Sequence, residues 1–411
     1  MPNALVKVLE VMFEEFVENY DAGCVMSMQA ERGDRDPKAM QRAGDTFYVK
    51  QDYMTTVQTG LDISGGSATD VIERVVPTTF RTPDNVRFDL DALELRDTEK
   101  KKKYGKAAAL RLSAEIDKNL MAIVGLQAGI VLKNTTAFAW PMGSAAEAAL
   151  VTRGISTDQG QIKLFINPTD YQPVAIDLGN RAYLGAVNNA AYQRNEVPPI
   201  SLFQTFRTDN YYNLAVTGTV SGTTVSGAQS FTPTAMTAGV PTDNRRMTLT
   251  VAGVNIANTK VGDAFTIAGV NAVHMIDKSD TGSLQSFRII SGQGTASLVI
   301  TPAIIATGPY QNVTAVAGAG AALVFLNTAT KPVNAFWRQG AVTIDYGRPA
   351  FDEFDGAGVT VMSATTKQGV PLAMMAAAGV LTGKLTCRFT TMYAATVLLP
   401  EQCGLILANQ V

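Results

Sequence analysis

Residues 97–132 read DTEKKKKYGKAAALRLSAEIDKNLMAIVGLQAGIVL, the stretch of the chain with the strongest helical character. No proline interrupts it, and Asp97 or Thr98 can cap its amino terminus, with Glu99 in the first turn. The following apolar residues recur at helical spacing: Tyr104, Ala108, Leu112, Ile116, Leu120, Ile123 and Leu126. At 1.5 Å per residue the predicted helix is roughly 50 Å long. A helix of this length suits the spine of a larger fold.

The amino-terminal 43 residues are predicted to form a helix followed by a loose arm. One face of a helix over residues 4–20 carries Leu5, Val8, Leu9, Met12, Phe13 and Phe16. Charges then cluster at residues 31–37, ERGDRDP, which contain little that can be buried. We therefore expect residues 1–43 to lie as an arm over another surface.

Residues 44–80 read as a long, extended β-hairpin loop. Its two strands are predicted at residues 46–50 and 70–76, which are rich in β-forming side chains. The glycine-rich segment 60–66 supplies a flexible tip. Because an isolated hairpin is marginally stable at best, we expect a neighbouring copy of the protein to support it. At the tip, Leu61 and Ile63 are the candidate contacts with that copy.

The composition changes abruptly after Val216. Between residues 217 and 330 only nine residues are charged, and Gly, Thr, Ala, Val and Ser dominate. Short β-type runs recur between turn residues, at 247–251, 264–267, 286–290, 296–300 and 321–325. This spacing is typical of a small barrel or sandwich. Since mixed α/β sequence flanks the region on both sides, we predict a β domain inserted at residues 216–334 into an α+β host.

The bulk composition indicates a globular protein of two or three domains. The chain has 411 residues, 46% of them hydrophobic and 17% charged, and its formal charge is −2. A protein that grips DNA through phosphates normally carries a basic excess, so specific DNA binding is disfavoured. The sequence has no signal-peptide pattern and no apolar run long enough to span a membrane. We expect a protein made and kept in the cytosol, with no membrane partner.

The sequence contains no motif of an enzyme, and we predict no catalytic, cofactor-binding or metal-binding residue. His274 is the only histidine and lacks the sequence context of a triad or a nucleophile elbow. Asp352, Glu353 and Asp355 suggest a calcium loop, but they lack the ligand spacing of an EF-hand. An exposed acidic turn is the better interpretation. The three cysteines have neither metal-type nor disulfide-type spacing.

Asp243, Arg245 and Arg246 form a charged cluster in a region that otherwise has few charges. Two interpretations remain open for them. They form either a solvated hairpin loop or an ion-pair site between two copies of the protein.

Several segments, in order along the chain, resemble the coat proteins of short-tailed phages of the Salmonella-phage type. They are 40–51 (MQRAGDTFYVKQ), 82–85 (TPDN), 95–97 (LRD), 165–171 (FINPTDY), 224–231 (TVSGAQSF), 261–270 (VGDAFTIAGV) and 333–337 (VNAFW). The resemblance implies the α+β fold of tailed-phage major capsid proteins. It places a peripheral domain with the spine helix at 81–135, the first part of an axial domain at 136–215, a β-barrel domain at 216–334, and the return into the host fold at 335–411.

The same resemblance implies a major capsid protein that assembles into pentamers and hexamers of an icosahedral phage head. The implied partners are other copies of the chain, a scaffolding protein, a portal protein and packaged double-stranded DNA held without sequence-specific binding. A decoration protein remains an open partner. Assembly is expected in the cytoplasm of the bacterial host, followed by expansion of the shell, and the protein ends in the virion.

Three other functions are less well supported by the sequence. An encapsulin-like cellular nanocompartment uses the same fold, but the inserted β domain argues against it. A β-rich binding protein of the virion surface explains the middle of the chain and leaves the spine helix without a purpose. An enzyme with an unrecognised site is the weakest alternative, because His274 stands alone.

Overall fold

The computed structural model describes residues 3–33, 35, 42–55, 57, 59–62, 64, 72–91, 94–155, 161–180, 197, 199–218, 220, 222–356, 358–379 and 382–410. The chain divides into two compact units, each built from three separate stretches. The first unit comprises Met1–Phe47, Thr78–Leu120 and Thr343–Thr396, and the second comprises Tyr48–Pro77, Met121–Val342 and Val397–Val411. The six segments expected from the sequence are a finer division, which stays a prediction.

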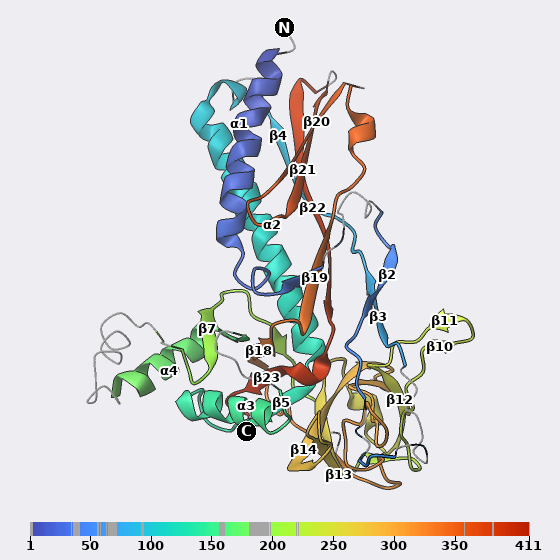
Figure 1. Ribbon diagram of the computed structural model, residues 1–411. Helices are drawn as coiled ribbons and strands as arrows, with labels where there is room; N and C mark the ends of the chain where they lie inside the picture. The colour runs from blue at the N-terminus through green and yellow to red at the C-terminus, as the bar shows by residue number, and fades with distance from the viewer. Residues whose placement is uncertain are drawn as a thin grey trace. The chain divides into compact units, whose positions relative to one another are not determined.

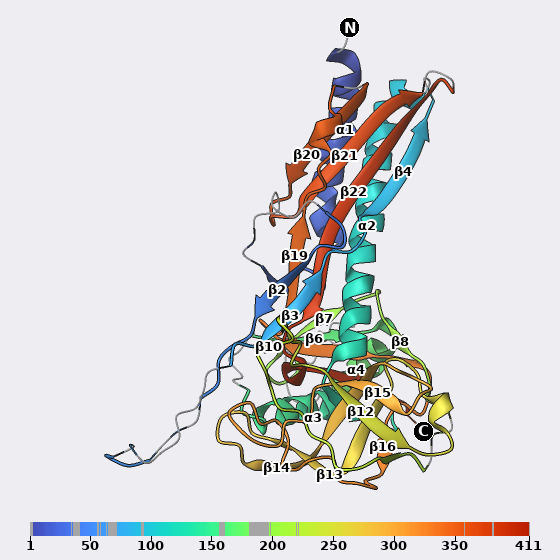
Figure 2. The ribbon, with the colours of Figure 1, turned by 90° about the vertical axis from the view of Figure 1, so that its right-hand side faces the viewer.

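The first unit contains a six-stranded sheet with two helices packed on it (Figure 2). The order is β1-β19-β22-β21-β20, and β4 pairs with β22. Phe16 of α1 contacts Phe389 of β22, and Phe88 of β4 contacts Tyr104 of α2, with ring centroids 4.8 and 5.2 Å apart. These aromatic contacts fix both helices on the sheet. The elements are α1 Asn3–Tyr20, η1 Asp21–Gly23, β1 Glu31–Arg32, β4 Asp84–Leu90, η3 Glu94–Arg96, β19 Val342–Gly347, η6 Asp352–Phe354, β20 Val359–Thr365, β21 Pro371–Gly379 and β22 Lys384–Val397.

The predicted amino-terminal helix is confirmed as α1, but the loose arm after it is wrong for the described residues. The N–H groups of Val25, Met26 and Ser27 donate to the buried carboxylate of Asp117 at 2.7, 3.0 and 2.9 Å. Strand β1 then pairs in parallel with β19. The segment is therefore folded onto its own unit, because its backbone finds partners far along the sequence.

The spine helix is confirmed as α2, Thr98–Gln127, although it ends before the predicted Leu132. The Asp97 carboxylate accepts the N–H groups of Glu99 and Lys100 at 3.0 and 3.3 Å, so Asp97 is the cap. Beyond the helix, β5 Ile130–Lys133 pairs in parallel with a strand near the carboxyl terminus. The apolar residues at 130–132 thus belong to a buried strand, which periodicity alone does not distinguish from a helix.

The predicted hairpin is confirmed by the pairing of β2, Thr46–Lys50, with β3, Val75–Thr79. Backbone hydrogen bonds join Gly44 to Phe80 at one end and Gln51 to Arg74 at the other. This register sets the second strand a few residues later than the sequence indicated. Residues 63, 65 and 66 of the predicted tip, and residues 70 and 71 of the predicted second strand, lie outside the described residues.

A five-stranded mixed sheet forms the centre of the second unit, in the order β5-β23-β18-β6-β7. Strand β18 is antiparallel to both neighbours, whereas β5 and β7 run parallel to theirs. Residues 165–171, one of the segments that carry the resemblance, form the end of β6 and the start of α4. The elements are α3 Trp140–Val151, β6 Ile162–Ile166, α4 Pro168–Asn180, β7 Phe203–Arg207, β18 Asn334–Arg338, η7 Pro400–Gln402 and β23 Cys403–Leu407. The core includes Phe138, Ala146, Leu150, Ile162, Leu164, Ile166, Val174, Ile200 and Phe336.

The inserted region forms a closed β-barrel within the second unit (Figure 1). Its six strands follow the order β16-β13-β14-β15-β12-β9, and backbone hydrogen bonds from Val225 to Ala321 and from Leu323 to Thr223 join the two edges. All five β-type runs predicted from the sequence lie wholly or partly in these strands. They are β9 Thr224–Val225, β12 Met247–Ala252, β13 Ala264–Val273, β14 Asp280–Ser291, β15 Ser297–Thr301 and β16 Leu323–Phe325; η5 is Ile256–Asn258. The interior includes Leu249, Phe265, Ile267, Phe287, Ile289, Leu298, Ile300 and Val313.

The chain enters and leaves the barrel through one pair of strands. Strand β8, Asn213–Leu214, pairs with β17, Lys331–Pro332. The two strands lie next to each other where the chain enters and leaves the barrel, and the exact bounds of the inserted domain, 216 and 334, stay a prediction.

Candidate functional site

The β2–β3 hairpin exposes apolar side chains beyond its paired strands. Tyr53 is 52% exposed, and Val57 and Leu61 are 93% and 110% exposed. Lys50 and Glu73 form an ion pair of 2.8 Å across the hairpin. Leu61, one of the two residues predicted to contact a neighbouring copy, is thus fully accessible, whereas Ile63 lies outside the described residues. The hairpin presents an apolar surface that its own chain leaves open.

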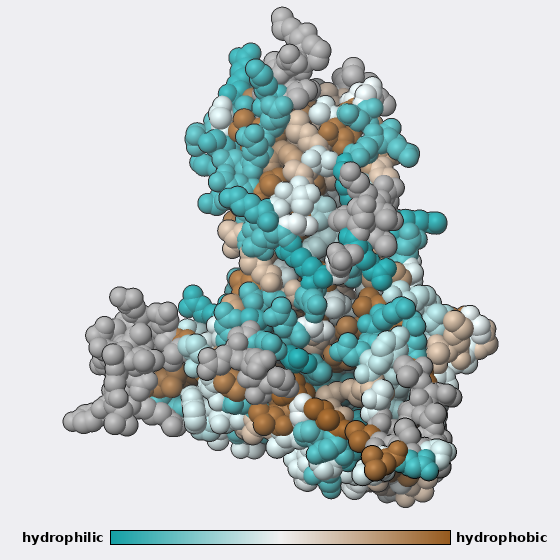
Figure 3. Space-filling view, in the orientation of Figure 1, coloured by the Kyte–Doolittle hydropathy of each residue, from teal (hydrophilic) through white to brown (hydrophobic). Residues whose placement is uncertain are grey.

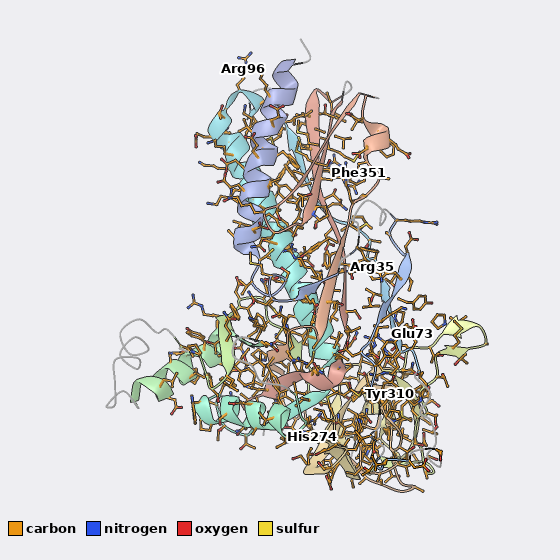
Figure 4. The ribbon with its side chains drawn as sticks, in the orientation of Figure 1. Arg35, Glu73, Arg96, His274, Tyr310 and Phe351 are labelled. Carbon is orange, nitrogen blue, oxygen red and sulfur yellow. The ribbon has the colours of Figure 1, made fainter. Side chains whose placement is uncertain are left out.

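The base of the hairpin, by contrast, is anchored within the second unit. The Gln51 side-chain amide donates to the carbonyl of Leu398 at 2.5 Å, and the Tyr310 hydroxyl of the barrel donates to the carbonyl of Ile72 at 2.8 Å. The Arg74 guanidinium lies over the Tyr310 ring, 4.0 Å from its centroid. Figure 4 labels Tyr310 in the barrel and Glu73 on the hairpin. A fixed base and an exposed distal segment make the hairpin a suitable connector.

The charged cluster of the barrel is paired within its own chain. The Arg245 guanidinium donates to both carboxylate oxygens of Asp243, at 2.9 and 2.8 Å, and also to the carbonyl of Val397. Arg246 lies 3.5 Å from the same carboxylate. Burial would raise the pKa of Asp243, but the hydrogen bonds from Arg245 and the two positive charges outweigh it and lower that pKa. The Arg245 side chain is 3% exposed and that of Arg246 is 35% exposed, so Arg246 is the arginine accessible to another molecule.

A short hairpin directly before this cluster was missed by the sequence analysis. Strands β10, Met236–Thr237, and β11, Val240–Pro241, form it, and its pale colours in Figure 3 mark an apolar to neutral surface. Met236 and Val240 are 64% and 57% exposed. The Asn244 side chain holds the base of this hairpin by bonding both the N–H and the carbonyl of Thr234. The signal in the sequence was Gly239, whose φ of +79° is typical of a tight turn.

His274 and the acidic turn around Asp352 make ordinary local contacts. His274 lies 2.8 Å from Asp277, and it packs so closely on Gly154 that a Cβ there would meet its ring nitrogen at 2.4 Å. Asp352 pairs with Arg348 at 2.5 Å. Within the described part of the chain, no group of three His, Cys, Asp or Glu side chains could hold a metal ion.

The three cysteines have the properties of core residues rather than of reactive thiols. All three thiols are free and buried, and burial raises the pKa of Cys24 and of Cys387 to about 12. A thiol with such a pKa is a poor nucleophile at neutral pH.

Among the described residues, no helix has the length and apolar character needed to cross a membrane.

Comparison with known proteins gives a family match over nearly the whole chain. The model of the family described as P22 coat protein, gene protein 5, matches residues 1–408. The CUS-3 coat protein I-domain is 38% identical, and the match covers 27% of this chain and 99% of that one, with a TM-score of 0.21. A structure from Mycobacterium phage Che8 is 8% identical over 93% of this chain and 90% of that one, with a TM-score of 0.45. A virus-like particle from Pyrococcus furiosus is 9% identical over 97% and 98%, with a TM-score of 0.40.

Proposed function

Because the chain belongs to the P22 coat protein family, we propose that the β2–β3 hairpin joins copies of it into a closed shell. The protein is the major capsid protein of an icosahedral phage head and a component of the virion, and its family is one of structural proteins rather than enzymes. The family also removes the nanocompartment and surface-binding alternatives. What remains to be assigned is which surfaces of the subunit make the shell.

The observation that carries this proposal is the contrast in exposure along the hairpin. Gln51 and Ile72 hold its base, while Val57 and Leu61 are almost completely exposed. Exposed apolar side chains on a two-stranded hairpin gain most from burial against a second copy of the chain. A contact repeated around a shell needs little affinity at each site, because every subunit of the shell makes it.

The finer features of assembly belong to the same proposal. We infer that the shell consists of pentamers and hexamers, forms on a scaffolding protein in the bacterial cytoplasm, and expands when DNA is packaged through a portal. The formal charge of −2 supports a wall that encloses double-stranded DNA without binding it tightly. A decoration protein bound to the outside of the shell is compatible with this scheme.

The test is the replacement of Leu61 by aspartate, alone and together with Ile63→Asp. We expect soluble subunits with unchanged thermal unfolding and no closed shells by electron microscopy after expression with the neighbouring scaffold gene. Leu284→Asp is the matched control, because Leu284 is 44% exposed on barrel strand β14 and its variant should still form shells. Normal shells from the Leu61→Asp variant would remove the hairpin from the assembly contacts.

A second contact is proposed at Asp243, Arg245 and Arg246, with Arg246 as the residue that reaches a symmetry-related copy. Arg245 contributes to this contact indirectly, because its guanidinium holds the Asp243 carboxylate in place. The exposed β10–β11 hairpin lies directly before the cluster and adds apolar area to the same contact. Reversing the charge at Asp243 with lysine should lower shell yield, and unchanged yield and particle size would argue against this contact.

A further inference from the structure

A partly enclosed cavity in the second unit gathers more positive than negative charge. Four separate segments line it: the base of the hairpin through Arg74, the residues after α3 through Arg153, the barrel through Lys278, and η7 through Glu401. Glu401 is the one acidic side chain among the described residues of this lining. The cavity thus collects three cations around one carboxylate.

The polar groups of these side chains are only partly used by the protein. Arg74 is 6% exposed, and its Nε has no hydrogen-bond partner among the described residues. The Lys278 ammonium donates to the carbonyls of Met275 and Gln311 at 2.6 and 3.1 Å and to the Met54 sulfur at 3.9 Å, so it brings positive charge to the cavity rather than a free N–H group. Glu401 accepts a hydrogen bond from the Asn312 amide at 3.2 Å. The cavity therefore keeps one buried donor without a partner among the described residues, the Nε of Arg74, next to an excess of positive charge.

Charge in this cavity is not balanced by the single carboxylate. Burial lowers the pKa of Arg153 to about 10, and it also lowers the pKa of Arg74 and of Lys278, although Glu401 acts on all three in the opposite direction. Asp52 and Asp277 act on these cations too, but both are exposed to solvent. Desolvated positive charge that is left unpaired is unfavourable, and a bound anion would neutralise it.

We propose that this cavity binds one small inorganic anion of about the size of chloride, held by Arg74, Arg153 and Lys278. The space open to a water-sized molecule is about 20 Å³. A single water needs roughly 10–15 Å³ by this measure, so the cavity fits one small ion and is too small for a bulky organic anion. The ion would join the hairpin base, the barrel and the carboxyl-terminal segment, and so fix the base from which the hairpin extends.

The test compares the full-length subunit in sodium chloride and in sodium gluconate at the same ionic strength. Gluconate is too large for the cavity, so we expect a higher Tm in chloride, with an effect that saturates as chloride replaces gluconate. Line broadening of chloride-35 in NMR measures the bound ion directly. An equal Tm in the two salts, with no broadening, would overturn the proposal.

Variants separate this site from general salt effects. Arg153→Met should abolish the difference between the two salts, and Lys278→Met, which changes a less buried residue, should reduce it if the first variant does not fold. Glu401→Gln removes the competing carboxylate and should lower the half-saturating chloride concentration at least fivefold. Lys331→Met, an exposed lysine of β17 in the same unit, is the control and should behave as the parent protein. Retention of the full chloride effect in Arg153→Met or Lys278→Met, or an unchanged midpoint in Glu401→Gln, would contradict the assignment.

Discussion

The barrel and the β2–β3 hairpin use the same kind of sequence, β-forming residues between turns, in opposite ways. In the barrel, backbone hydrogen bonds join the two edges of the sheet at β9 and β16. The eight interior side chains named above are all completely buried. In the hairpin β2 and β3 form a sheet of only two strands, with a single bridge from Val75 to Asp243, and Leu61 is as exposed as in an extended chain. A closed sheet satisfies its own backbone, whereas an open one leaves edges and apolar side chains for a partner. We therefore expect the closed barrel to contribute to the stability of the subunit and the open hairpin to contribute to the assembly of the shell.

The largest effect expected from this contrast is in the barrel core. Phe287 is completely buried and contacts Phe265 with ring centroids 5.8 Å apart. Phe287→Ala should lower the free energy of unfolding by about 3–5 kcal/mol, because it leaves a cavity in a closed interior. Val324→Ala on the exposed face of β16 is the control, and Leu61→Ala in the hairpin should change stability by less than about 0.5 kcal/mol. Urea unfolding of the soluble subunit measures all three, and comparable losses for Phe287→Ala and Leu61→Ala would break the contrast.

A second test asks whether the closed sheet is sufficient by itself. Residues 216–330, expressed alone, should give the circular dichroism of a β protein, dispersed amide signals and a cooperative unfolding transition. The fragment should be less stable than the barrel in the full chain, because buried Arg288 loses its acceptor, the Gly125 carbonyl of α2. Hydrogen bonds to charged groups contribute about 1.5–3 kcal/mol, and Arg288→Met in the fragment should recover part of the loss. An unfolded fragment would mean that the barrel depends on its host.

The sequence predicts the barrel better than the amino-terminal segment, for a physical reason. Alternating residues such as Met247, Leu249 and Val251 form a local pattern, and that pattern alone identifies β12. Residues 25–32 are held by Asp117 and by strand β19, whose positions are set only by tertiary structure. The pairing of Arg245 with the distant Val397 carbonyl was hidden for the same reason. Partners that are far apart in sequence leave no local signal.

A smaller effect is expected where the hairpin meets the barrel. Tyr310→Phe removes the hydroxyl that donates to the Ile72 carbonyl and leaves the ring in place beneath Arg74. We expect a loss of about 1 kcal/mol of subunit stability, with faster hydrogen exchange of the amides near Ile72. Tyr211→Phe is the control, because Tyr211 is 43% exposed. Unchanged exchange near Ile72 would show that this bond does not hold the base of the hairpin.

The smallest effect is expected at the ion pair between Lys50, the last residue of β2, and Glu73, which precedes β3. Their side chains are 67% and 44% exposed, so solvent screens the 2.8 Å contact and Lys50→Met should leave subunit stability almost unchanged. If the hairpin serves assembly, the same variant should affect shells more than subunits, because a change in the strands alters the presentation of Leu61 at every contact. Thermal unfolding of the subunit and shell yield by sedimentation separate the two quantities. Lys331→Met, which removes an exposed lysine outside the hairpin, is the control. A variant that lowers subunit stability by several kcal/mol and leaves shell yield intact would place the hairpin with the barrel, as a part of the fold rather than a connector between copies.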